Sequence, residues 1–130
     1  MQSSGAGPRS AKSRILVVED DRSSRNALSA LLRLSGYEVL NAATLTEGQA
    51  LLADSPDCVI LDLMLPDGNG TDLLSYVRAH HLPISVVVTT GAIDWSTTLS
   101  PPNATPDVIF PKPVDYRQLV TWLDDHCWVQ

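Results

Sequence analysis

The residues best suited to chemistry in this chain are polar side chains, each placed where a short apolar run ends. Glu19 and Asp20 follow one run, Asp62 follows another, Thr90 ends a third, and Lys112 follows the last. Carboxylates brought within a few ångströms of one another repel by roughly 1 to 4 kcal/mol per pair, so such a pocket needs protons or a cation. Oxygen ligands without His or Cys indicate a hard ion. Mg²⁺ favours one or two carboxylates, several waters and a phosphate oxygen.

A lysine and a threonine would complete this pocket as a site for phosphoryl transfer. Lys112 would lie opposite the cation and hold an anionic group between two positive charges. Thr90 adds a hydroxyl donor, and Gly91 after it lets a backbone N–H approach closely. In phosphoryl transfer, positioning and charge neutralisation do most of the catalysis. We therefore predict that the central carboxylate, Asp62, is the nucleophile.

Each of these residues also has a purely structural interpretation when it is taken alone. The acids after the first run could form an exposed loop and a helix N-cap. Asp62 could be a turn residue ahead of the Pro-Asp-Gly sequence at 66–68. Thr90 could be a strand end and Lys112 a solvated side chain. The functional interpretation depends on all five occurring in order, each at the C-terminal end of a predicted strand.

The elements that must position these residues alternate along the chain. The apolar runs are rich in Val and Ile, as expected for parallel strands covered on both faces, and lie at 15–18, 39–40, 58–61, 84–88 and 108–110. Amphipathic segments separate them, the first being a helix over 23–34 with Gly36 as its C-terminal cap. Further helix starts are signalled at Thr44 with Glu47, at Asn69 or Thr71, and at Asp115 with Gln118.

This alternation implies right-handed crossovers and an α/β fold, a doubly wound five-stranded parallel sheet with strand order 2-1-3-4-5. The C-terminal strand ends of such a sheet share one edge, so the polar residues there should converge. The fourth crossover is unusual because it contains Pro101, Pro102 and Pro106. Proline inside a helix costs about 3 kcal/mol or more. We predict an irregular, Pro-rich fourth helix.

Size and composition restrict the class of protein. A chain of 130 residues has room for one domain. Its net charge of −6 argues against nucleic-acid binding, and no stretch approaches the roughly 18 apolar residues of a membrane span. The N-terminus lacks the apolar core of a signal peptide, so we expect a disordered lead-in over 1–13 and a cytoplasmic location. Cys58 and Cys127 lack zinc-site spacing and are expected to be buried thiols.

Together these motifs resemble the receiver domain of bacterial two-component response regulators, which has a flavodoxin-like fold. The matching segments are ILVVEDD at 15–21, VILDLMLPDGNG at 59–70, VVVTTG at 86–91 and FPKP at 110–113. The resemblance covers the chain from Arg14 to its end, so we expect a single receiver domain over 14–130.

The resemblance implies a role for each matching acid. Asp62 would be the phosphoacceptor. Mg²⁺ would be bound by Asp20 directly, by Glu19 mostly through water, by Asp62, and by the main-chain carbonyl of Met64.

The resemblance also implies how the switch is set and reset. Lys112 would pair with the phosphoryl oxygens, and its bond to Pro113 is usually cis in the family. Thr90 would swing toward the phosphoryl group and couple phosphorylation to the surface. The donor would be a phosphohistidine on a sensor kinase or phosphotransfer protein, and hydrolysis by water would reset the switch. The chain would then be a signalling phosphoacceptor and not an enzyme with other substrates.

Two departures from the family pattern fall on the face of the fourth helix, fifth strand and fifth helix, where receivers commonly form homodimers or meet partners. Ile109 stands where an aromatic residue is common, and Phe110 should point to the opposite side of the strand. The usual Gly-Ala pair ahead of this strand is replaced by SPPNATPDVIF. Trp122 lies off the apolar stripe of the last helix, so it is either in an interface or folded over neighbouring side chains.

Three other interpretations remain open. A phosphohydrolase of the haloacid dehalogenase type would carry a second acid where this chain has Met64. A flavodoxin-like cofactor binder would need a phosphate-cradling loop where Glu19 and the two following acids would repel phosphate. The third alternative is a pseudo-receiver that acts as a phosphorylation-independent interaction module.

Overall fold

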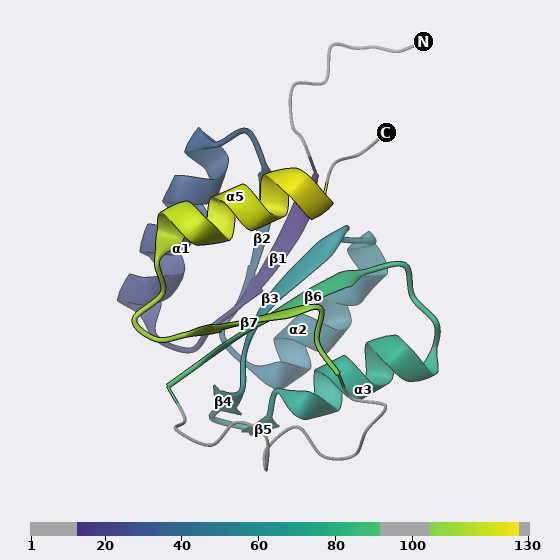
Figure 1. Cartoon of the computed structure of the whole chain (residues 1–130). Coiled ribbons are helices and arrows are strands. Elements are labelled where there is room, and N and C mark those ends of the chain that lie inside the picture. The colour runs from purple at the N-terminus through teal and green to yellow at the C-terminus, as the bar shows by residue number, and fades with distance from the viewer. Residues whose placement is uncertain (1–12, 92–104, 128–130) are drawn as a thin grey trace, which may run out of the picture.

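A parallel sheet at the centre of the fold carries the predicted site residues to one edge. The computed structural model describes residues 13–91 and 105–127 (Figure 1). Its strands are β1 (Arg14–Val18), β2 (Glu38–Ala42), β3 (Cys58–Asp62), β6 (Ser85–Thr90) and β7 (Val108–Pro111). They lie in the order β2-β1-β3-β6-β7, and all neighbours are parallel. Counted along the chain this is the predicted order 2-1-3-4-5, so the doubly wound α/β fold is confirmed.

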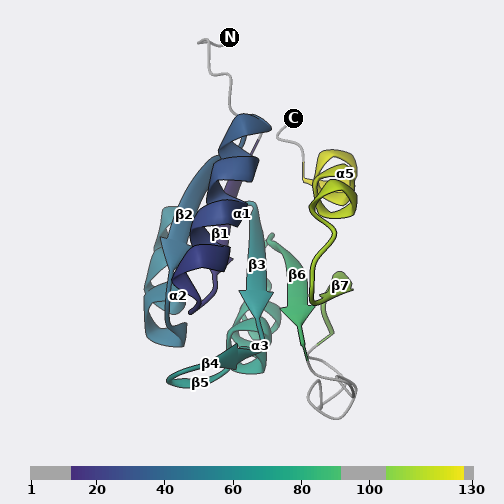
Figure 2. The same cartoon turned by 90° about the vertical axis from the view of Figure 1, so that its left-hand side faces the viewer.

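Helices cover both faces of the sheet (Figure 2). On one face lie α1 (Arg22–Leu34) and α5 (Tyr116–His126), and on the other α2 (Leu45–Leu51), a 3-10 turn (Leu52–Asp54) and α3 (Thr71–Ala79). Side chains alternate along each strand. In β1, Ile15 and Val17 pack with α1 and α5, whereas Leu16 and Val18 pack with α2 and α3. Each face therefore has its own hydrophobic core.

The central strand β3 is buried along its whole length. Cys58 at its start is 0% exposed, and Asp62 at its end is 5% exposed. The strand pairs with β1 on one side and with β6 on the other. Asp62 is therefore the last residue of a strand that is held by both cores, which fixes where its carboxylate can lie.

Side-chain caps begin three of the helices, and the sequence predicts two of them, at Thr44 and Asp115. The carboxylate of Asp21 accepts a hydrogen bond from the N–H of Ser24 at 2.8 Å, and α1 begins at Arg22, one residue earlier than expected. The Thr44 hydroxyl accepts from the N–H of Glu47 at 3.1 Å. Asp115 accepts from two amides in the first turn of α5.

One local structure was not predicted, and two predicted segments fall outside the described residues. A short antiparallel hairpin of β4 (Met64–Leu65) and β5 (Gly68–Asn69) follows β3, where the sequence indicated only a turn. Residues 92–104, which include most of the Pro-rich fourth crossover, and 1–12 of the lead-in lie outside the described ranges. None of the described helices is long and apolar enough to cross a membrane.

Candidate functional site

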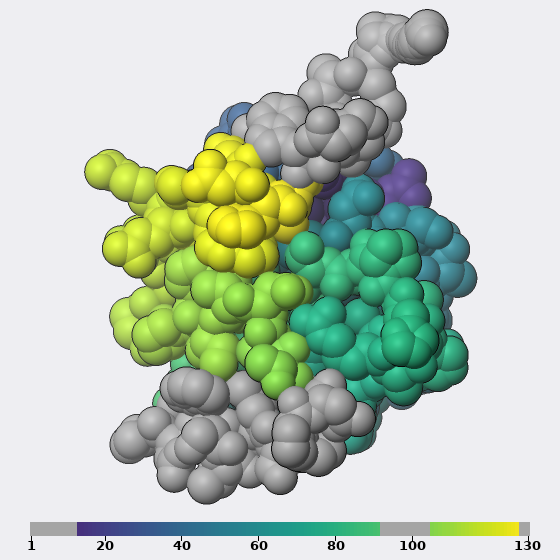
Figure 3. Space-filling view, turned by 45° about the vertical axis from the view of Figure 1, so that its right-hand side comes forward, coloured from purple at the N-terminus to yellow at the C-terminus, as the bar shows by residue number. Residues whose placement is uncertain are grey.

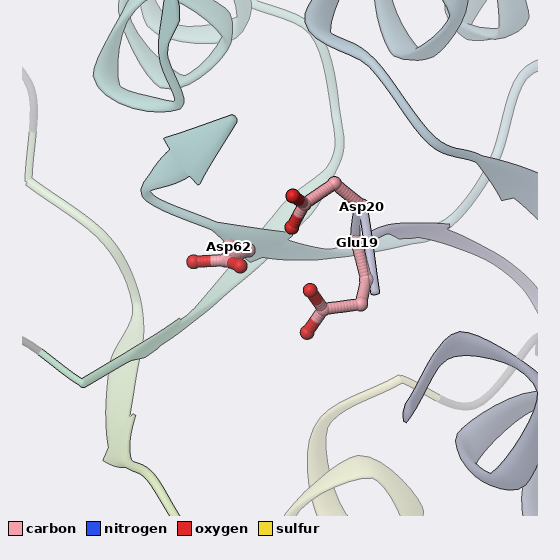
Figure 4. Close-up of side chains that lie close together, drawn as sticks. All are labelled: Glu19, Asp20 and Asp62. Atoms are coloured by element: carbon pink, nitrogen blue, oxygen red, sulfur yellow. The ribbon is translucent and has the colours of Figure 1, made fainter. Parts of the chain in front are cut away.

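The carboxylates of Glu19, Asp20 and Asp62 converge at the C-terminal edge of the sheet (Figure 4). One oxygen from each lies within 4.8 Å of the others. Glu19 and Asp62 are buried, whereas Asp20 is exposed. The first two acids stand on the turn between β1 and α1, and Asp62 ends β3 beside it. The structure thus brings together the three acids that the sequence predicted to converge at one edge of the sheet.

The ammonium of Lys112 compensates part of this negative charge. Its Nζ donates to Oε1 of Glu19 at 2.8 Å and to Oδ2 of Asp62 at 3.1 Å. Partial burial by itself lowers the pKa of Lys112, but the hydrogen bonds to both carboxylates outweigh burial and raise this pKa above its ordinary value of 10.5. Lys112 is held in turn by its main-chain N–H, which donates to the carbonyl of Thr90 at 2.8 Å. Its peptide bond to Pro113 is cis, as predicted.

Main-chain amides fix the orientation of the two buried carboxylates. The N–H of Met64 donates to Oδ1 of Asp62 at 3.1 Å, and the N–H of Asp21 donates to Oε2 of Glu19 at 3.2 Å. Each carboxylate therefore has one oxygen on Lys112 and the other on a backbone N–H. Charge-assisted hydrogen bonds of this kind hold both position and orientation.

The threonines that end β6 lie on different sides of the sheet. Thr90 is 1% exposed and is the last residue of the strand, beside Pro111 in the register with β7. Thr89 stands beside Asp62 in the register with β3, and successive side chains point to opposite faces. Thr89 lines a cavity of about 220 Å³ together with Glu19 and Lys112. The structure therefore places Thr90 at the predicted edge of the sheet and adds Thr89, which the sequence motifs did not single out.

Arg25 is a second residue that the sequence did not identify. Its Nη1 donates to the carbonyl of Glu19 at 2.9 Å and lies 3.4 Å from the carbonyl of Asp20. Arg25 stands four residues after the N-cap Asp21, so the helix turns its side chain back toward the loop that precedes it. The guanidinium thereby fastens the turn that carries two of the three acids.

The hairpin after β3 is fastened to a neighbouring helix by Asp67. Its carboxylate accepts from the N–H of Leu45 at 2.7 Å and from the N–H and hydroxyl of Thr46 at 3.0 and 2.8 Å. These hydrogen bonds, at the start of α2, lower the pKa of Asp67 from its ordinary 3.8. They tie the segment that follows Asp62 to the start of α2.

The residues at this edge fit a magnesium ion. The donors are carboxylate oxygens, and no His or Cys belongs to the group, as hard cations require. Three carboxylates face one ammonium, which leaves negative charge for a cation to compensate. The exposure of Asp20 leaves room for the waters that Mg²⁺ usually keeps. Among the described residues, 13–91 and 105–127, this is the one cluster of three or more such ligands.

Comparison with known proteins identifies the same family over most of the chain. Residues 15–124 match the family model described as the response regulator receiver domain. The transcriptional regulatory protein CpxR of Klebsiella pneumoniae is 36% identical over 107 residues, which cover 82% of this chain and 46% of that protein. The response regulator MprA of Mycolicibacterium vanbaalenii is 34% identical over 108 residues, with 82% and 47% covered. The chain spans about half the length of these curated relatives.

Solved structures agree with this match. A CheY-like response regulator receiver domain protein from Methanospirillum hungatei superposes with a TM-score of 0.81 at 32% identity, over 89% of this chain and 93% of that one. A signal receiver domain from Vibrio parahaemolyticus gives a TM-score of 0.79 at 26% identity, over 89% and 90%.

Proposed function

Since this chain belongs to the family of response regulator receiver domains, we propose that it is a phosphorylation switch of two-component signal transduction with Asp62 as its phosphoacceptor. The observation that carries the proposal is the position of Asp62, buried at the end of β3 with one oxygen on Lys112 and the other on the N–H of Met64. A carboxylate held in this way is positioned to react, and its charge is compensated on one side.

The phosphoryl donor that we propose is a phosphohistidine on a sensor kinase or phosphotransfer protein. An oxygen of Asp62 would bond to phosphorus while the P–N bond breaks, and the histidine would leave with a proton from water. The product is an acyl phosphate on Asp62, which water later hydrolyses. Positioning and charge compensation supply most of the catalysis, so the chain acts only on itself and is not an enzyme with other substrates.

Magnesium would supply the remaining charge neutralisation when bound. We assign its ligands to Asp20 directly, Glu19 mostly through water, Asp62, and the main-chain carbonyl of Met64. Lys112 would turn an N–H toward a phosphoryl oxygen and so hold the anion from the other side. The fit of the oxygen-only donor set supports this assignment.

The relay that we propose runs from Thr90 to the face formed by β7 and α5. Residues that include Val108, Phe110 and Trp122 line a groove on this face. Figure 3 shows the β7 and α5 segments at the surface, in light green and yellow. Trp122 packs against the core and stacks on His126 with ring centroids 4.2 Å apart, which supports the interpretation that it is folded over its neighbours. Its partial exposure leaves an edge for a partner or a second copy of the chain.

The orientation of Ile109 favours a second candidate, the pseudo-receiver that binds partners without accepting phosphate. Ile109 packs against the core on the α2/α3 side, whereas Phe110 packs on the α1/α5 side, the opposite orientation that the sequence predicted. No aromatic ring therefore stands at the position from which family members relay the state of the threonine. In either case we place the protein in the cytoplasm, with no direct binding of nucleic acid by this domain, in keeping with its net charge of −6.

Intact mass after incubation with acetyl phosphate distinguishes these candidates. The chain is expected to gain one phosphoryl group when Mg²⁺ is present and none after chelation by EDTA. Asp62→Asn should gain none, while Asp72→Asn, which removes an exposed acid on α3, should behave as the natural chain. The absence of any magnesium-dependent mass gain would overturn the switch and leave the pseudo-receiver.

A further inference from the structure

The hairpin that follows Asp62 is held at its tip by a helix from an earlier part of the chain. The strands β4 and β5 pair with each other and with no strand of the five-stranded sheet. Asp67 lies in the turn between them. Both oxygens of its carboxylate accept hydrogen bonds from Leu45 and Thr46, the first two residues of α2, over distances of 2.7 to 3.0 Å (Figure 2). The hairpin and the start of α2 are therefore joined.

The first turn of α2 depends on Asp67 for two of its backbone donors. The first amides of a helix have no partner within the helix. The hydroxyl of Thr44 satisfies the amide of Glu47, and Asp67 satisfies the amides of Leu45 and Thr46. Leu45 also packs on the hairpin, since a Cβ added at Gly68 would lie 3.1 Å from Cδ2 of Leu45. A shift of the hairpin tip would therefore disturb the start of the helix.

The register of the hairpin decides where the main-chain groups of Met64 point. Met64 stands opposite Asn69, and the N–H of Gly70 donates to the carbonyl of Leu63 at the next pair. Hydrogen-bonded and non-hydrogen-bonded pairs alternate along antiparallel strands, so Met64 and Asn69 form a pair without mutual hydrogen bonds. The N–H of Met64 instead donates to Oδ1 of Asp62 at 3.1 Å. Because the N–H and carbonyl of one strand residue lie on the same side of the strand, the carbonyl of Met64 also faces the side of the Asp62 carboxylate.

We propose that Asp67 is a positioning residue for the cation site, an inference that rests on the magnesium site proposed above. Its hydrogen bonds to α2 fix the hairpin and so keep the carbonyl of Met64 directed toward that site. Asp67 is not itself a ligand, because both of its oxygens bond to α2 and it does not belong to the cluster of three acids. Without it the hairpin would keep the packing of Leu65 against the α2/α3 core but lose all three hydrogen bonds at its tip.

The coupling between the hairpin and the cation must act in both directions. If the bonds of Asp67 to α2 raise the affinity for the cation, the bound cation stabilises those bonds by the same factor. The amides of Leu45 and Thr46 report on this effect because they are two of the donors. We therefore expect Mg²⁺ to slow hydrogen exchange at both amides. A side chain that only capped the helix would protect these amides equally with and without Mg²⁺.

Variants of the hairpin and of α2 test the effect on affinity. Asp67→Ala should bind Mn²⁺, followed by electron paramagnetic resonance, roughly 10-fold more weakly than the natural chain. Asp67→Asn keeps one side-chain oxygen as an acceptor and should recover part of the affinity. Thr46→Val removes one of the three hydrogen bonds without a change of charge and should show a smaller loss. Asp54→Ala, which removes an exposed carboxylate from the 3-10 turn, is the control for charge alone and should stay within about twofold.

Amide exchange, measured by nuclear magnetic resonance with and without Mg²⁺, tests the coupling in the natural chain. We expect exchange at Leu45 and Thr46 to slow by up to about 10-fold when Mg²⁺ is added. The same amides should not respond to Mg²⁺ in Asp67→Ala. If the natural chain bound no Mn²⁺, the magnesium site and this inference would both fail. Equal affinities of the natural chain and Asp67→Ala would overturn the positioning role alone, as would exchange at the two amides that ignores Mg²⁺.

Discussion

Gly70 lies directly against the main chain of Asp62. Its N–H donates to the carbonyl of Leu63 at 2.8 Å, and a Cβ added at Gly70 would overlap the carbonyl oxygen of Asp62 and lie 3.0 Å from Cα of Leu63. Glycine is needed here for space and not for its backbone freedom, because its φ of −57° is open to any residue. The residue that follows the hairpin therefore packs against the main chain of the proposed phosphoacceptor, with no room for a side chain between them.

We expect Gly70→Ala to lower the free energy of unfolding by about 1 to 3 kcal/mol, because the close-packed backbone must shift. The same shift should slow phosphorylation by displacing Asp62. Urea unfolding measures the first effect. Gly91→Ala is the matched control for stability, since a Cβ there would meet nothing within 4 Å. Equal free energies of unfolding for the two variants would show that the backbone near Gly70 can shift without loss of stability.

Removal of the ammonium of Lys112 should slow phosphorylation strongly. Lys112→Ala leaves the buried carboxylates of Glu19 and Asp62 without their shared partner and takes away a positive charge from the transferring group. We expect the rate of phosphorylation by acetyl phosphate to fall by about 100-fold or more. Arg117→Ala, which removes an exposed charge on α5, is the control. A rate within twofold of the natural chain would exclude a role for the ammonium.

Arg25 should be needed for the affinity of divalent cations, although it cannot be a ligand. In Arg25→Ala the turn loses the guanidinium that holds the carbonyls of Glu19 and Asp20. We expect Mn²⁺, followed by electron paramagnetic resonance, to bind roughly 10-fold more weakly, as is usual when a group that orients metal ligands is lost. Arg25→Lys should restore part of this affinity. Arg33→Ala removes an exposed arginine of the same helix and is the control. Tighter Mn²⁺ binding in Arg25→Ala would mean that repulsion between the guanidinium and the cation outweighs the hydrogen bonds that hold the turn.

The stability that Asp67 contributes should depend on pH in one direction. Hydrogen bonds from the start of α2 depress its pKa below 3.8 in the folded chain. A carboxyl group of this kind stabilises the fold above its unfolded pKa and loses that contribution as the pH falls through the lower, folded pKa. The melting temperature of Asp67→Asn should therefore fall below that of the natural chain at neutral pH. The difference should shrink once the pH drops below 3.8. A difference between the two chains that is constant with pH would contradict the assignment.

The sequence predicted those parts of the site whose positions depend only on the topology of the sheet. Asp62 and Lys112 are far apart in the chain, yet parallel strands bring their C-terminal ends to one edge, so a carboxylate and an ammonium at two such ends must be neighbours. The same argument placed Glu19 and Asp20. It required only the alternation of strands and helices, which the apolar runs made clear.

What the sequence could not predict depends on local register and on side chains that fold back. Thr89 and Thr90 differ only in which side of the sheet they face, and the apolar run before them does not show which side lines the cavity. An arginine in the first turn of a helix, such as Arg25, has the same pattern whether it is solvated or turned toward the preceding loop. Trp122 lies off the apolar stripe, yet it packs against the core and also stacks on His126 along the helix.

Lys112 joins four strands at one edge of the sheet through two kinds of bond. Its ammonium has three N–H donors, and carboxylates that follow β1 and end β3 accept from it, while its main-chain N–H bonds to the last carbonyl of β6. An acyl phosphate on Asp62 would compete with Glu19 for those donors. The ion pair between Lys112 and Glu19, which connects β7 to β1, would then weaken. The ion pair between Lys112 and the phosphorylated Asp62, which connects β7 to β3, would strengthen because the phosphoryl group adds negative charge. Phosphorylation would thus change which strands Lys112 connects, and this response would need no aromatic ring at position 109.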